Sequence, residues 1–61
     1  MNEFDVKRLA LILAIQAEIE GMKAVNFERK SQGRPLAYNE SAFKIAAEEL
    51  RNLAYKHNDQ L

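Results

Sequence analysis

The first half of the chain has apolar residues on two opposite sides of a predicted helix. At 100° per residue, one stripe continues to the turn and consists of Ile12, Ile15, Ile19, Met22 and Asn26. A second stripe of small residues lies on roughly the opposite side and consists of Ala10, Ala14, Ala17, Gly21 and Ala24. A helix that is apolar on all sides is typical of a buried helix. We therefore expect this helix to contact at least two neighbours, of which the chain supplies one.

The small stripe steps by four, three, four and three residues, which is the spacing of a coiled-coil seam. Gly21 costs about 1 kcal/mol relative to alanine in a helix interior, so we expect it to have a packing reason. Small residues let two helix backbones approach closely, and we interpret the stripe as an oligomer seam. The other interpretation is that alanine is simply the best helix former.

Capping residues mark the ends of two predicted helices. Asn2 is a favourable N-cap for the first, Gly33 favours its end, and Pro35 cannot continue it. Asn39 is the next candidate N-cap. We predict one domain over residues 1–61, with a helix over about 3–31, a turn over about 32–39 and a helix over about 40–57.

The second helix has an ordinary amphipathic pattern. One face holds Phe43, Ala46, Ala47, Leu50, Leu53, Ala54 and His57. Tyr38 and Phe43 stand at the two positions of a hydrophobic staple around the N-cap. The last residues, "NDQL", are expected to fray.

Length and composition indicate that the hairpin needs support from outside the chain. Folded chains as short as 61 residues usually depend on disulfides, a metal or a partner. There is no cysteine, and the single histidine argues against a structural zinc. Self-association is the remaining route. We therefore predict an all-α, antiparallel two-helix hairpin that assembles into a homo-oligomeric helical bundle.

Charge and hydropathy narrow the functional classes. Nine basic residues balance nine acidic ones, which argues against nucleic acid and membrane surfaces as partners. The apolar run "LALILAI" is too short to span a bilayer. Glu3 and Asp5 disrupt the basic leader that a signal peptide requires. Together with the absence of cysteine, this predicts a cytoplasmic protein.

The residues give little support for a catalytic function. Ser31 and Ser41 lie at helix ends, where serine normally caps, and His57 lies far along the hairpin from both. Bundle metal sites combine inward glutamates with Glu-x-x-His pairs, which the sequence lacks. We expect no enzyme activity, no metal and no cofactor.

The turn end concentrates the candidate binding residues. They are Lys23, Asn26, Arg29, Arg34, Tyr38 and Asn39. Arginine and lysine bind phosphate or carboxylate with charge-assisted hydrogen bonds, and an aromatic ring can stack on a base. In the structural account, Asn26 fixes register and Arg29 pairs with Glu40 or Glu28. In the ligand account, turn ends of several subunits line shared clefts.

The predicted architecture resembles small phage proteins that sequester nucleotide immune signals. The resemblance covers the whole hairpin and rests on size, assembly and a cationic end, with no matching motif. It implies sequestration of a nucleotide-derived signal in pockets between subunits, as an anti-defence function. The hairpin is also similar in shape to small phosphatase-like sporulation regulators, but "AAEELRN" stands where those carry their Ser-Gln-Glu-Leu-Asp stretch.

The sequence thus favours a non-catalytic binding protein. We expect a homo-oligomer that captures a small anionic ligand, nucleotide-derived ligands included, at the turn end between subunits. The alternative is a small regulatory module that docks on another protein through its apolar helix face.

Overall fold

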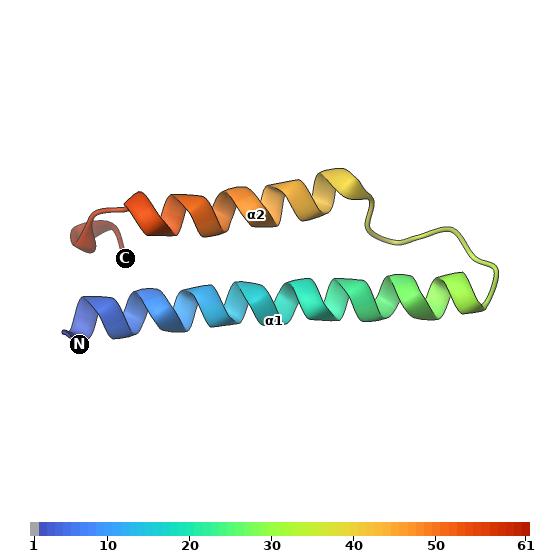
Figure 1. Cartoon of the computed structure of the whole chain (residues 1–61), viewed down its shortest axis with the longest axis horizontal. Coiled ribbons are helices and arrows are strands. Elements are labelled where there is room, and N and C mark those ends of the chain that lie inside the picture. Colours follow the sequence, from blue (N-terminus) through green and yellow to red (C-terminus); the bar gives the residue numbers. More distant parts are fainter. Residues whose placement is uncertain (1) are drawn as a thin grey trace.

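The computed structural model describes residues 2–61 and shows a helical hairpin without strands in that range (Figure 1). α1 comprises Glu3–Ser31 and α2 comprises Glu40–Tyr55. A short 3-10 helix, η1, follows at Asn58–Gln60. The two long helices lie side by side and antiparallel, so both chain ends lie at the same end of the hairpin (Figure 1). Residues 32–39 connect the two long helices.

Local capping explains where α1 begins and ends. The Asn2 side chain accepts a hydrogen bond from the Asp5 backbone N–H at 2.8 Å, which satisfies one of the free donors of the first turn. At the other end, Gly33 has a φ of 72°, a left-handed conformation that favours glycine. The Gly33 N–H donates to the Lys30 carbonyl at 3.1 Å and closes the last turn. Both signals were readable in the sequence.

α2 ends at Tyr55, two residues before the predicted end. Lys56 and His57 have extended backbone conformations, so the prediction that His57 shares the apolar face of α2 is wrong. Ala54 is exposed as well, although it was also placed on that face. The last residues, which are expected to fray, form η1 in this structure. Its turn is fixed by a hydrogen bond from the His57 N–H to the Gln60 side-chain oxygen at 3.2 Å.

The core is a single thin layer between the two helices. Leu53, with 6% of its surface exposed, is the only buried residue among residues 2–61. The stripe of α1 predicted to face a partner helix is half-buried against α2 and consists of Ile12, Ile15, Ile19, Met22 and Asn26. The molecule measures 47 × 18 × 11 Å, the shape of two helices laid together. One side of each helix is therefore all that the chain can cover.

Arg8 joins the two helices at the terminal end of the hairpin. Its Nε donates to the Leu53 carbonyl at 2.8 Å, and its Nη2 donates to the Lys56 carbonyl at 2.6 Å and to Asn58 Oδ1 at 3.3 Å. The last turn of α2 has no basic residue of its own. Arg8 therefore supplies from α1 the positive charge and the donors that the free carbonyls at a helix C-terminus require.

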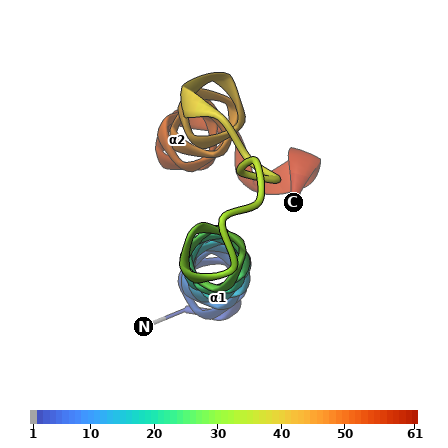
Figure 2. The same cartoon turned by 90° about the vertical axis from the view of Figure 1, so that its right-hand side faces the viewer.

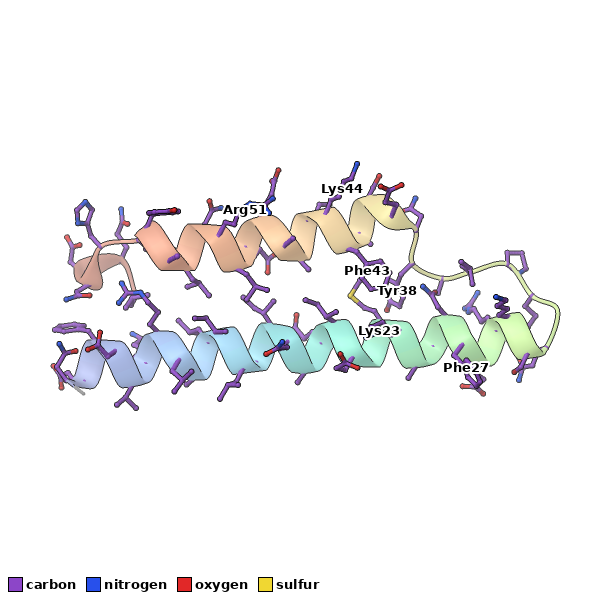
Figure 3. All side chains as sticks on the ribbon, in the orientation of Figure 1. Lys23, Phe27, Tyr38, Phe43, Lys44 and Arg51 are labelled. Atoms are coloured by element: carbon purple, nitrogen blue, oxygen red, sulfur yellow. The ribbon has the colours of Figure 1, made fainter. Side chains whose placement is uncertain are left out.

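We expect Arg8→Ala to destabilise the hairpin by about 1.5–3 kcal/mol, because carbonyls at the end of α2 lose a charged donor. Arg51→Ala is the matched control, since Arg51 points away from α1 in Figure 3. Thermal unfolding followed by circular dichroism measures both variants. Equal melting temperatures for the two variants would show that the Arg8 contacts contribute nothing.

Candidate functional site

The turn end of the hairpin is built around the Asn26 side chain. Its Nδ2 donates to the Tyr38 carbonyl at 2.8 Å, and its Oδ1 accepts from the Tyr38 N–H at 3.0 Å. The amide thus pairs with one backbone residue in both directions, as a neighbouring strand would. This contact holds the extended segment before α2 against α1. The sequence correctly placed Asn26 on the core-facing stripe, but its partner could not be read from it.

The second asparagine of the predicted site is also engaged with the backbone. Asn39 Oδ1 accepts from the Ala42 N–H at 3.2 Å and caps the start of α2. Both asparagines therefore have roles in holding the turn. The chemistry left for a ligand at this end comes mainly from the cations and from Tyr38.

The cations at the turn end differ in their partners. Lys23 Nζ lies 3.2 Å from Glu20 Oε1, and both side chains are largely exposed. Arg34 Nη1 donates to Gln32 Oε1 at 3.4 Å. The Arg29 side chain is half-buried and makes no hydrogen bond or ion pair with any of residues 2–61. It is the one predicted binding cation in that range whose donors are unused.

The structural account of Arg29 is not what the hairpin shows. Neither the Glu28 pair nor the Glu40 pair considered for it forms among the described residues. Glu40 instead lies 3.4 Å from Lys44, one helical turn along α2. The interaction is local because the extended turn separates the start of α2 from the end of α1 (Figure 1).

The aromatic residues near the turn point in different directions. Phe27 is 75% exposed and lies on the side of α1 away from α2 (Figure 3). Tyr38 and Phe43 lie between the helices where α2 begins, at the positions expected of a hydrophobic staple (Figure 3). Tyr38 keeps 37% of its surface exposed. Tyr38 is therefore the aromatic face available beside the turn, whereas Phe27 belongs to a different surface.

A shallow groove of about 270 Å³ lies between the helices, away from the turn. It is lined by Leu11, Ile15, Glu49, Asn52, Leu53 and Lys56. None of the predicted ligand-binding residues lines it. Within residues 2–61 no cluster of acidic, histidine and cysteine side chains is arranged to hold a metal ion. In the same range, no helix has both the length and the apolar character needed to cross a bilayer.

The side of α1 opposite α2 is uncovered in the hairpin (Figure 2). We define it as the outer face of α1. Its centre is the small stripe, all of it exposed: Ala10, Ala14, Ala17, Gly21 and Ala24. Its flanks are exposed apolar residues: Val6, Leu13 and Phe27 on one edge, and Val25 on the other. A Cβ built on Gly21 meets no atom within 4 Å, so nothing in the chain itself requires glycine there.

Comparison with models of known protein families, with curated proteins and with solved structures returns no match. The turn end and the outer face of α1 are the two surfaces of the hairpin that bear on its function.

We expect Asn26→Ala to lower the free energy of unfolding by about 1–3 kcal/mol, because the Tyr38 backbone loses both hydrogen bonds. Asn52→Ala is the matched control, since it makes the same helix-favouring change at an exposed position of α2. Urea unfolding followed by circular dichroism compares them. If Asn26→Ala is as stable as Asn52→Ala, the pairing with Tyr38 does not hold the turn.

Proposed function

We propose that this protein is a non-catalytic interaction module that works as a homo-oligomeric helical bundle. The outer face of α1 is its contact surface, and this face binds a second copy of the chain. One observation carries the proposal: the nine residues of this face are apolar or small, exposed, and on the side of α1 away from α2, the helix that the chain places against α1. A helix apolar on opposite sides is stable in water when both sides are covered.

The solvent-exposed area of the chain exceeds that of a compact monomer by about one partner's share of an interface. The chain exposes 4886 Å². A compact monomer of 7.0 kDa exposes about 4,000 Å² by the size scaling of folded proteins. The excess of roughly 800–900 Å² is close to the ~800 Å² that each partner contributes to a standard interface.

A second copy fits this surface better than an extended peptide or a flat protein surface. The small residues recur at seam spacing along a straight helix, and such a stripe is complementary to another helix that can approach closely. Every other copy of the chain carries such a helix. The balanced charge, nine against nine, imposes no net repulsion between copies. We place the module in the cytoplasm, on the cysteine-free composition.

Gly21→Leu separates assembly from helix formation. In an isolated hairpin the substitution meets open space and removes a poor helix former, so it should stabilise a monomer by up to about 1 kcal/mol. In the proposed bundle the leucine forces the helices apart, which costs about 1–3 kcal/mol per buried copy. We expect a smaller species in analytical ultracentrifugation and a lower, more concentration-dependent melting temperature.

Glu48→Leu, which adds the same side chain at an exposed position of α2, is the control and should leave the sedimentation unchanged. A wild-type chain that sediments as a folded monomer at micromolar concentration contradicts the proposal. A monomer that sediments with a larger protein partner instead supports docking on a different protein through the same face.

A second candidate function is capture of a small anion at the turn end. The observation that favours it is that Arg29 is a half-buried residue whose guanidinium has no partner among residues 2–61, because such donors bind phosphate or carboxylate strongly. Lys23, Arg34 and Tyr38 would add charge and a stacking face. In this proposal the ligand is a phosphate-bearing small molecule, with nucleotide-derived signals as the class to test, and the function is sequestration of the kind that phage anti-defence proteins perform.

We expect Arg29→Ala to weaken such binding by roughly ten- to a hundredfold, since a charge-assisted hydrogen bond contributes about 1.5–3 kcal/mol. Arg51→Ala, which removes the same charge from the far side of α2, should bind as the wild type does. Calorimetric titration with nucleotides, cyclic nucleotides and inorganic phosphate measures the effect. No heat from any of these ligands with the wild-type chain rules this candidate out for them and leaves the interaction module unaffected.

A further inference from the structure

We infer that two copies pair through the outer faces of α1 in an antiparallel arrangement, with a two-fold axis near Ala17 and with Lys7 of each copy beside Glu28 of the other. The inference rests on the proposed self-association and specifies its geometry. Three observations carry it: the symmetry of the small stripe, the charges at its two ends and the apolar residues on its edges.

The spacing of the small stripe is nearly the same when it is followed from either end of the helix. Its steps of four, three, four and three residues become three, four, three and four when the helix is reversed. Ala17 stands at its centre. When two stripes overlap fully in antiparallel orientation, Ala10 lies opposite Ala24 of the second copy, and Ala14 lies within one residue of the second copy's Gly21. Small residues then face small residues along the whole seam, which allows close approach of the backbones.

The charges that follow the stripe select this orientation. Lys7 precedes Ala10 by three residues and Glu28 follows Ala24 by four, so both continue the seam, and both are exposed. At about 1.5 Å per residue they lie roughly 15 and 16 Å from Ala17 in opposite directions. An antiparallel pair therefore brings opposite charges together at both ends. A parallel pair would bring lysine to lysine and glutamate to glutamate.

The contact that Lys7 already makes is compatible with this pairing. Its Nζ donates to the Leu61 carbonyl oxygen in the hairpin. An ammonium group has three N–H donors, so two remain for the carboxylate of a second copy. Because Lys7 and Glu28 lie at the rim of the contact, their attraction adds orientation more than affinity.

The edges of the outer face agree with the same register. Val6 comes beside the second copy's Phe27 on one edge. These two residues are 54% and 75% exposed in the single chain, so the pairing covers apolar surface that the hairpin leaves in water. One like-charge contact opposes the pairing, because the Glu18 residues of the two copies lie near each other, close to the two-fold axis. The exposure of Glu18 allows water and salt to screen that repulsion.

An isologous contact of this kind closes on itself, so it produces a dimer rather than a filament. It also places the two turn ends at opposite ends of the assembly. In this dimer an anion site at Arg29 would be formed by one copy, not by a cleft between two turns.

Cysteine cross-linking tests the orientation. The natural chain has no cysteine, so introduced thiols can pair only with each other. Ala10→Cys and Ala24→Cys are mixed, with an affinity tag on one variant, and are oxidised at micromolar concentration. We expect a mixed disulfide on a non-reducing gel, because opposed seam positions lie within the roughly 7 Å Cα–Cα limit of a disulfide. Ala10→Cys alone should give little cross-linked product.

Charge reversal tests the two ion pairs. Lys7→Glu and Glu28→Lys should each weaken the dimer roughly tenfold at low salt, because two attractive contacts become repulsive. The double variant should restore the wild-type affinity, since both pairs are attractive again with their signs exchanged. Loss of the Leu61 contact alone cannot produce that rescue. Sedimentation equilibrium measures all four proteins.

The outcomes separate this inference from the function on which it rests. A wild-type chain that is monomeric overturns both. A dimer in which Ala10→Cys cross-links with itself, or in which neither cysteine combination cross-links, leaves self-association standing and overturns the antiparallel pairing. If Ala10→Cys and Ala24→Cys form a mixed disulfide but the double charge variant does not restore the dimer affinity, the assigned ion pairs are overturned.

Discussion

α1 is apolar on two opposite sides, and α2 can cover only one of them. This constraint decides most of what the hairpin shows. α1 has 29 residues and α2 has 16, so even the covered side of α1 has a shorter helix against it. The result is a thin contact with one buried residue, Leu53, among those described. The outer face of α1 remains in water unless another molecule covers it.

Polar contacts therefore hold the two helices together, which a larger apolar core does in bigger proteins. Arg8 ties the end of α2 and the segment after it to α1 at one end of the hairpin. Asn26 ties the Tyr38 backbone to α1 at the other end. Both reach across the hairpin to backbone groups, which fixes the register of the helices without large side-chain packing. The middle of the hairpin is left to the isoleucines and Met22 of α1.

The helices could be predicted from the sequence because their signals are local. Asn2, Gly33, Pro35 and Asn39 act on their own turns, and the isoleucine stripe follows directly from helical period. The end of α2 was placed too late because its cap comes from Arg8, which is 45 residues from Leu53 in the chain. No local signal could reveal a cap donated by another helix.

The candidate site was harder to predict for the same reason. A cluster of cations and amides around a turn shows which donors are present but not which of them the backbone already uses. Asn26 is engaged by the Tyr38 backbone, whose position depends on how the chain returns to α1, whereas Asn39 makes the local N-cap contact that its position predicts. The Arg29 side chain makes no hydrogen bond or ion pair among residues 2–61, and Glu40, the first carboxylate of α2, pairs with Lys44. A residue pattern shows which carboxylates are near in sequence but not which of these pairs form.

The outer face of α1 and the turn end make different demands on an assembly. A seam between two α1 helices needs close approach along most of their length, so it uses the middle of the helix and both of its ends. A ligand site at Arg29 needs the guanidinium to remain open to solvent. The proposed antiparallel pair allows both, because at 100° per residue Arg29 lies about a quarter turn around α1 from the centre of the seam. Self-association through the outer face therefore leaves the turn-end chemistry intact, and the two proposed functions can coexist in one molecule without competing for the same surface.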